Sequence, residues 1–536
     1  MEYKFMTPIE VWEDCNPVAE DLSVDVVRTY EEDGVVYEKI YYTVKKTEQG
    51  ECRAYTLVAR PKKKGKLPVV LIAPSPTGRE IDKSLVDGAV KDGYVAVVVD
   101  LEGQVDGKQR YTFYPDDLDY CNLSRTGRHI QYAEPSARET IWYNWTYVVR
   151  RAITLISSLD YADDTKIALI GVDQSSLVAW QTAGMDGRLS CMVSIFGYNP
   201  QKIEEEQEEK DCWLSGVDQR SYAPFVTVPV LHVGGTNTND DVVSFTEKTV
   251  ERMKDKSLFY ADYGFGNEHA LTVRQINTIK EFIKKVFLGE QFAQGPTMEI
   301  EKGIDGEFKI KINAPSAKSA EIWYAYLTEP KKVFWKKVET GKKNGELIAS
   351  FSLAKEDERV AIYARANYSK FSIVSRPSYI ETSRMGASVH ERRSTRILFD
   401  GTSDKNLIPI VEDKLVFDNS IEVVEGALGL MGVTVAGGGI AYVFDPEQPI
   451  DLTFASSLQF EVYSLSAFTL SIRLYSGDIV YKMEKKFRGG TGWQRVHLSS
   501  SSFKNENMQK LSSFEEVWKV DFPNLQSALI RNVLLI

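Results

Sequence analysis

A short polar turn follows the apolar run that ends at Ile170. Residues 171–175 read Gly-Val-Asp-Gln-Ser. A buried strand that passes through a sharp turn into a helix displays the side chain at the turn beyond the carboxyl edge of a sheet. That position holds Asp173, so the group presented for chemistry is a carboxylate, which can act as a nucleophile.

The elements around this turn alternate between strands and helices over residues 35–290. Apolar and β-branched runs predict strands at 35–44, 54–59, 67–74, 94–100, 166–170, 191–196, 230–234 and 258–262. Helical spacing predicts helices near 82–92, 136–158, from about 174, at 242–254 and at 271–287. This alternation predicts an α/β domain with a largely parallel, doubly wound sheet.

Two segments interrupt the alternation. Residues 101–135 are polar, aromatic and rich in turns, which is typical of a lid or binding loop. Residues 201–222 form a second insertion that begins with the acidic run at 204–209. Such a run predicts a solvated helix face.

The pattern changes after Gly295-Pro296. Residues 297–385 show short alternating strands without a helical period, which predicts an immunoglobulin-like β-sandwich. A polar linker at 386–394 precedes a second all-β unit, for which alternating strands and glycine-rich turns predict a jelly roll. The expected domains are therefore 1–292, 296–386 and 395–536.

The first 290 residues resemble the acetyl xylan esterase and dienelactone hydrolase branch of the α/β-hydrolases. The stretches that carry this resemblance are 66–72, 161–167, 171–175, 183–188 and 230–237. The pattern at the turn in this superfamily is Gly-x-Ser-x-Gly, from which the chain departs at Asp173 and Ser175. The last domain is similar to jelly-roll carbohydrate-binding modules through residues 492–498 and 502–503.

The resemblance implies three catalytic positions. Asp173 occupies the position of the nucleophile, and the loop that supplies the base contains His269. The acid follows strand 230–234, where Asp240 is the nearest match and Asp241 is the alternative. Both aspartates could instead cap the helix that begins near residue 242, and His269 could be a surface residue at the start of the final helix.

The chain has only five histidines, which narrows the choice of a base. His232 falls within an apolar strand, where a satisfied core histidine is expected. His390 lies in the linker and His497 in the last domain, while His129 belongs to the long insertion. His269 is therefore the expected general base.

The family's oxyanion hole would use the backbone N–H of Gln174 and one N–H from the loop after strand 67–74. In that loop Pro76 has no N–H, so Ser75 or Thr77 is the expected donor. A carboxylate at position 173 would repel an oxyanion that forms beside it, which argues against acyl transfer.

Asp173 leaves three interpretations open. As a nucleophile, a carboxylate attacks saturated carbon and forms an alkyl ester that His269 and water can hydrolyse, whereas attack on an acetyl group gives a mixed anhydride. In the second interpretation Ser175 or Ser176 attacks, although both lie beyond the tip of the turn. In the third, hydrolysis is lost and the fold survives, because aspartate tolerates a positive φ.

The resemblance to acetyl xylan esterases implies a carbohydrate-related hydrolase, with an atypical catalytic triad because Asp173 stands at the nucleophile position. The alternatives are a non-catalytic relative that binds glycans or acts as a scaffold, and an Asp-nucleophile hydrolase that acts at saturated carbon. Five aromatic residues of the β domains are candidates for stacking on sugars, although core packing is the expected role of each: Trp323, Tyr324, Trp335, Trp493 and Trp518.

Composition and the absence of certain motifs exclude several classes of binding partner and cofactor. The net charge of −11 disfavours a general nucleic-acid surface. No apolar stretch has the length of a signal peptide or a membrane span, so a cytoplasmic protein without membrane contact is expected. Five widely spaced cysteines predict free thiols. Nucleotide-binding and metal-binding motifs are absent, so no cofactor or metal is expected, and a carbohydrate or small ester is the expected substrate.

Overall fold

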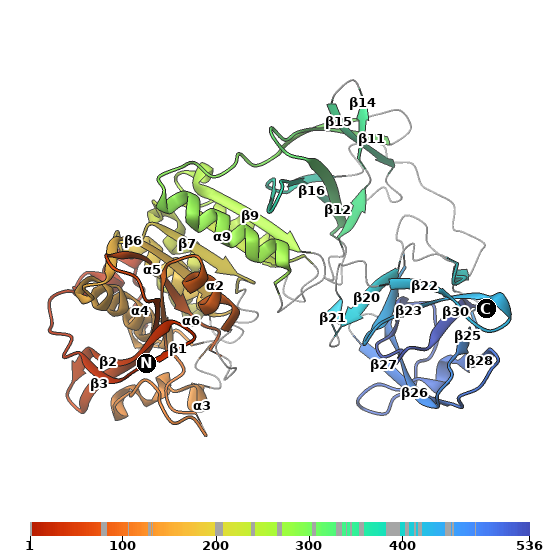
Figure 1. The fold of residues 1–536 in the computed structure, drawn as a ribbon, viewed down its shortest axis with the longest axis horizontal. Helices are drawn as coiled ribbons and strands as arrows, with labels where there is room; N and C mark the ends of the chain where they lie inside the picture. The colour runs from red at the N-terminus through yellow and green to blue at the C-terminus, as the bar shows by residue number, and fades with distance from the viewer. Residues whose placement is uncertain are drawn as a thin grey trace.

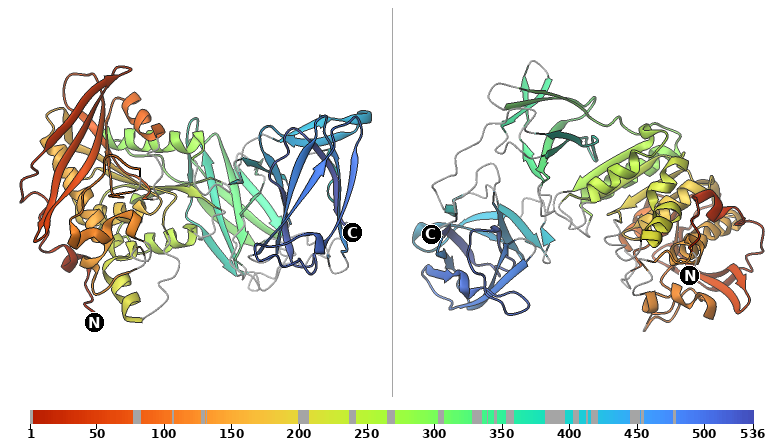
Figure 2. Two further views of the ribbon diagram at one scale, coloured as in Figure 1. Left: turned by 90° about the horizontal axis from the view of Figure 1, so that it is seen from below. Right: turned by 180° about the vertical axis from the view of Figure 1, so that it is seen from behind.

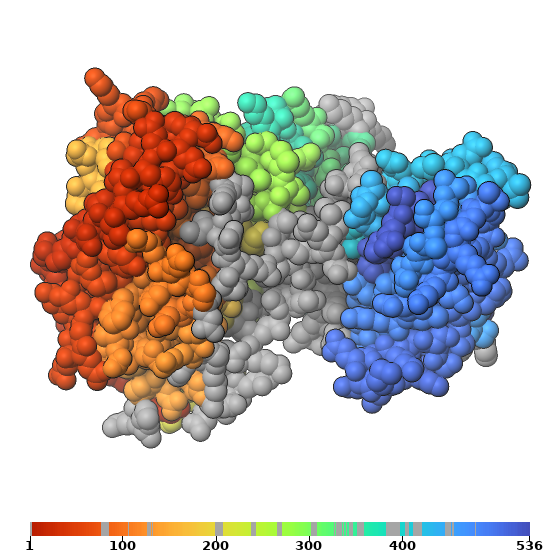
Figure 3. All heavy atoms as spheres, turned by 60° about the horizontal axis from the view of Figure 1, so that its bottom comes forward, coloured from red at the N-terminus to blue at the C-terminus, as the bar shows by residue number. Residues whose placement is uncertain are grey.

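The computed structural model describes most of the chain, namely residues 3–76, 83–105, 107–126, 130, 132–198, 207–236, 242–264, 271–302, 307–327, 335–338, 340–343, 346–352, 359–381, 397–402, 407–411, 414–415, 421–444, 452, 455–476 and 479–536. Three parts follow one another through the molecule (Figures 1 and 2). We call them the N-terminal domain (up to residue 292), the middle domain (297–381) and the C-terminal domain (397–536). The space-filling view shows the N-terminal and C-terminal domains at opposite ends (Figure 3).

A nine-stranded mixed sheet forms the centre of the N-terminal domain, in the order β1-β2-β3-β5-β4-β6-β7-β8-β9. Its strands are β1 (Asp25–Glu32), β2 (Val35–Thr47), β3 (Gly50–Pro61), β4 (Leu67–Ala73), β5 (Val95–Val99), β6 (Ala162–Val172), β7 (Cys191–Ile195), β8 (Val230–Gly235) and β9 (Phe259–Gly264). The run from β5 to β9 is parallel, and β1, β2 and β3 pair in antiparallel fashion. The predicted doubly wound α/β class is confirmed.

Helices cover both faces of this sheet. One face carries α2 (Lys83–Lys91) and α9 (Val273–Phe287). The other face carries α1 (Pro8–Trp12), α4 (Ile141–Ser158), α5 (Ser175–Met185), α6 (Gln207–Gly216), α7 (Gln219–Tyr222) and α8 (Val242–Val250).

Among the described helices, none is long and apolar enough to cross a membrane. All five cysteines are free, as predicted.

The two insertions are packed more tightly than the sequence suggests. Residues 101–135 include α3 (Leu123–Thr126), and the buried Tyr114 donates its hydroxyl hydrogen to the Leu101 carbonyl at 3.0 Å. Glu209 in α6 is only 7% exposed and accepts a hydrogen bond from the Ala133 N–H. The prediction of a solvated helix face is therefore wrong at Glu209, because α6 packs against the end of the first insertion.

The described strands of the other two domains pair only in antiparallel fashion. The middle domain contains β10 (Thr297–Lys302), β11 (Glu307–Asn313), β12 (Ser319–Tyr326), β13 (Lys336–Val338), β14 (Gly341–Lys343), β15 (Glu346–Ser352), β16 (Arg359–Asn367), β17 (Ser372–Val374) and β18 (Ser378–Glu381). Their sheets run β10-β11-β15-β14 and β13-β12-β16-β17, with β18 paired to β16. Apolar side chains of both sheets meet in one core, as in a β-sandwich.

The C-terminal domain also has two sheets around one core. Its strands are β19 (Ile397–Phe399), β20 (Leu407–Val411), β21 (Lys414–Leu415), β22 (Ile421–Glu425), β23 (Met431–Val435), β24 (Gly439–Val443), β25 (Ser457–Tyr463), β26 (Phe468–Ser476), β27 (Ile479–Phe487), β28 (Gln494–Ser499), β29 (Val517–Phe522) and β30 (Leu529–Leu535). The sheets run β22-β23-β30-β25-β28, with β19 paired to β30, and β21-β20-β24-β29-β26-β27.

The candidate sugar-stacking rings divide into two groups. Trp323, Tyr324 and Trp335 of the middle domain are buried, which confirms their expected role in core packing. Trp493 and Trp518 of the C-terminal domain are partly exposed. The Trp493 indole N–H donates to the Ala427 carbonyl at 2.9 Å, so this ring is held in place by the backbone.

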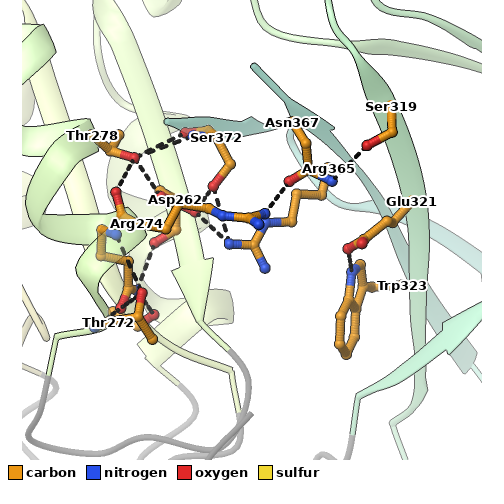
Figure 4. Close-up of polar contacts among 12 residues, drawn as sticks. Asp262, Thr272, Arg274, Thr278, Ser319, Glu321, Trp323, Arg365, Asn367 and Ser372 are labelled. Atoms are coloured by element: carbon orange, nitrogen blue, oxygen red, sulfur yellow. Dashed lines mark hydrogen bonds and ion pairs between the residues drawn. The ribbon is translucent and has the colours of Figure 1, made fainter. Parts of the chain in front are cut away.

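A buried polar network joins the N-terminal and middle domains (Figure 4). Asp262 of β9 is completely buried, and its carboxylate accepts hydrogen bonds from Ser372 and Thr278 at 2.7 Å each. The same carboxylate pairs with Arg365 of β16 at 3.3 Å. Arg274 of α9 also donates to the Asn367 side chain. These contacts fix β9 and α9 against the middle domain.

Candidate functional site

The polypeptide makes a tight turn where β6 ends and α5 begins. Asp173 has a positive φ of 51°, and its backbone N–H donates to the Ile195 carbonyl of β7 at 2.9 Å. Its own carbonyl accepts from the Ser176 N–H at 2.9 Å. Aspartate is one of the few residues that adopt this conformation readily. The structure thus places Asp173 at the carboxyl edge of the sheet, and its side chain is partly buried.

Gly171 allows β6 and α5 to approach each other at this turn. A Cβ atom at position 171 would lie 2.4 Å from the Ser175 carbonyl oxygen and 2.7 Å from the Ala179 Cβ. Both distances are far inside van der Waals contact, and the first involves backbone. Glycine is therefore required on steric grounds, whatever the chemistry of the turn.

The two serines after the turn are structural. Ser175 is fully buried, and its hydroxyl donates to the Pro74 carbonyl at 2.6 Å. Ser176 is fully buried as well, and its hydroxyl lies 3.2 Å from the carbonyl oxygens of Gly171 and Ile195. Neither hydroxyl is presented to a substrate, so the interpretation in which one of them attacks is not supported.

The bond from Ser175 to Pro74 brings together the two segments expected to form an oxyanion hole. Ser75 follows Pro74 beyond the end of β4, and Gln174 precedes the first turn of α5. Backbone N–H groups at a helix start have no partner inside the helix. The side-chain Oε1 of Gln174 is buried without a hydrogen-bond partner in the described part of the chain.

The expected base and acid lie outside the described residues. His269 belongs to the segment 265–270, between β9 and α9, and Asp240 and Asp241 belong to 237–241, between β8 and α8. Because β6, β8 and β9 are parallel, all three end at the same edge of the sheet. The catalytic roles of Asp173, His269 and Asp240 stay predictions.

His232 is a buried histidine of β8, in agreement with a core position. Its Nδ1 lies 3.1 Å from the Ser194 hydroxyl of β7, whereas its Nε2 has no partner among the described residues. Only one of the two ring nitrogens of His232 therefore has a hydrogen-bond partner among the described residues. Burial lowers the pKa of His232 to about 4, so the ring is neutral near pH 7.

A charged cluster at the end of β5 was not singled out by the sequence patterns. Lys108 pairs with Glu102 at 2.8 Å and with Asp100, and the second oxygen of Asp100 accepts from the Thr112 N–H at 2.6 Å. Two carboxylates directly after a buried strand were the available sign. The cluster ties the start of the 101–135 insertion to the sheet edge. In the described residues, no group of three or more acidic, His or Cys side chains could hold a metal ion.

Comparison with known proteins finds a family similarity in the N-terminal domain. Residues 54–257 match the Dienelactone hydrolase family. No curated protein matches the chain.

Three solved structures illustrate the similarity. Acetyl xylan esterase 1 from Thermoanaerobacterium sp. JW/SL YS485 is 14% identical with a TM-score of 0.41, over 54% of this chain and 96% of that one. An acetyl xylan esterase from Paenibacillus sp. R4 is 15% identical with a TM-score of 0.39, over 53% and 96%. A glucuronoyl esterase from Solibacter usitatus is 10% identical with a TM-score of 0.35, over 54% and 98%.

Proposed function

We propose, from the premise that residues 54–257 form a dienelactone hydrolase family domain of the α/β-hydrolase superfamily, that this domain binds a carbohydrate or small ester without hydrolysing acyl esters. One observation carries the proposal. Asp173 has a positive φ at the tip of the turn, which is the position that the sequence resemblance assigns to the nucleophile. The hydroxyl groups of Ser175 and Ser176 are buried and donate hydrogen bonds to backbone carbonyls.

Two physical reasons separate this turn from that of a serine esterase. A carboxylate that attacks an acyl carbon gives a mixed anhydride, which is a poor intermediate for ester hydrolysis. The negative charge of Asp173 would also lie beside the oxyanion that donors near Gln174 and Ser75 would have to stabilise. Like charges at close range in a partly buried site repel strongly.

Hydrolysis of p-nitrophenyl acetate tests the proposal. We expect the wild type to release p-nitrophenol at the rate of buffer alone. Asp173→Ser restores the hydroxyl at the turn and should gain activity, which a second substitution, His269→Ala, should remove. Robust wild-type hydrolysis that His269→Ala abolishes would defeat the proposal. Acetylated xylo-oligosaccharides are the first ligands for a binding assay, because the sequence resemblance points to carbohydrate esters.

A second candidate function is hydrolysis at saturated carbon with Asp173 as the nucleophile. The turn favours it because Asp173 is held at a positive φ with its backbone N–H bonded to Ile195. In this reaction a carboxylate oxygen forms a bond to carbon while the carbon–halogen bond breaks and halide leaves. Water then attacks the ester carbonyl and releases the alcohol. A single turnover of an alkyl halide in ¹⁸O-labelled water would leave the label in Asp173, which mass spectrometry of its peptide detects.

A further inference from the structure

A polar groove of about 530 Å³ lies at the edge of the sheet where the parallel strands begin. Asp173 lies at the other edge, where these strands end. Pro68 and Tyr94, at the amino ends of β4 and β5, line one side of it. The other walls come from α9 and from Lys370 in the turn between β16 and β17 of the middle domain. Its volume falls within the range of small-molecule sites.

Four lysines converge on this groove, although the chain as a whole carries a net charge of −11. They are Lys166 of β6, Lys280 and Lys284 of α9, and Lys370 of the middle domain. Lys280 lies 3.7 Å from Asp92. The other three form no ion pair in the part of the chain that the structure describes. Their positive charge is therefore available to a ligand.

The turn that carries Lys370 is fixed on the N-terminal domain. The ring of Phe371 lies 5.2 Å from that of Phe292, at the end of the N-terminal domain. The Tyr368 hydroxyl donates at 2.9 Å to the carbonyl of Gln294, in the segment that connects the two domains. The Asp262 network described above holds the adjoining Ser372. These contacts lie on both sides of Lys370 in the chain and join the middle domain to the N-terminal domain. The groove is therefore formed before a ligand binds.

We propose that this groove binds a hydroxylated organic dianion, such as a sugar phosphate or a dicarboxylated sugar. Four ammonium groups face two carboxylates, Asp92 and Glu281, which leaves a local charge that two anionic groups would neutralise. The carboxylates and the amide of Asn277 can accept hydrogen bonds from hydroxyl groups. Tyr94 offers an apolar surface for a sugar ring. The site lies away from Asp173 and does not depend on the function proposed above.

Calorimetric titration of the full chain tests this site. The probes are glucose 6-phosphate and digalacturonate, with glucose and inorganic phosphate as comparisons. We expect one dianionic sugar to bind at about 20 mM salt and to bind several times more weakly at about 300 mM salt, because the lysines are partly solvated. The preferred probe tells a phosphate ligand from a carboxylate ligand.

Substitutions locate the binding. Lys284→Ala and Lys370→Ala should each weaken binding by about three- to fivefold. Lys285→Ala is the matched control, because Lys285 neighbours Lys284 on α9 but pairs with Glu290 outside the groove. The proposal is overturned if neither dianion binds the wild type at about 10 mM, or if Lys285→Ala weakens binding as much as Lys284→Ala does. Equal affinity for inorganic phosphate and for the sugar probe would contradict the inference that the ligand carries hydroxyl groups.

Discussion

A hydroxyl that attacks a substrate has to be exposed and to share its proton with a base. Ser175 and Ser176 meet neither condition, because each is buried and donates to a main-chain carbonyl. Their hydrogen bonds hold the start of α5 against β4, β6 and β7. At the scale of single residues, any chemistry of this turn therefore falls to Asp173.

His232 shows how a second polar residue of the same sheet is restricted to the neutral state. Its ring is 1% exposed, and burial lowers its pKa to about 4 from an ordinary value of 6.5. When the pH falls below 6.5, the unfolded chain takes up a proton at this residue and the folded chain does not. The free energy of unfolding therefore decreases from about pH 6.5 downward, and the loss is complete near pH 4.

We predict that His232 contributes about 2 kcal/mol of the stability that the N-terminal domain loses between pH 7.5 and pH 5. Urea unfolding at the two pH values measures this loss. His232→Gln should show a correspondingly smaller difference between the two pH values than the wild type does. His497→Gln, at an exposed histidine of β28, is the control and should behave like the wild type. Equal pH dependence in all three proteins would contradict the prediction.

At the scale of elements, continuous apolar runs made the central strands β4 to β9 predictable, because buried parallel strands need apolar side chains on both faces. The edge strand β1 escaped prediction because nearly all of its residues are exposed, so packing imposes little pattern on its sequence. The turn at Asp173 was predictable from Gly171 and the apolar run before it. The partners of Ser175 and Ser176 were not, since those carbonyls belong to other strands.

The close crossing of β6 and α5 gives a prediction about the element itself. Gly171→Ala should destabilise the N-terminal domain by about 2 kcal/mol, because its methyl group would overlap the Ser175 carbonyl and force the backbone to shift. Thermal unfolding measures the change. Gly187→Ala, beyond the other end of α5, is the matched control, since a Cβ there meets nothing within 4 Å. A loss of stability no larger than that of the control would show that the turn adjusts freely.

At the scale of the whole molecule, the contact between the N-terminal and middle domains depends on groups far apart in the sequence. Asp262 meets Arg365, and buried Glu247 of α8 meets Arg376 at 2.8 Å. Apolar contacts accompany them, with the rings of Tyr263 and Tyr363 5.7 Å apart. The pattern of strands and helices along the sequence predicted the two kinds of domain. No local pattern shows which carboxylate of one domain pairs with which arginine of the other.

The Asp262–Arg365 pair makes the two domains depend on each other. Arg365→Met keeps the length of the side chain but leaves the buried Asp262 carboxylate without its cation, which should cost about 3 kcal/mol of stability. Asp262→Asn in the same protein removes the stranded charge and should recover most of that loss, because the amide can still bond Ser372 and Thr278. Urea unfolding followed by tryptophan fluorescence measures both effects. If Arg365→Met unfolded at the wild-type urea concentration, the ion pair would play no part in holding the domains together.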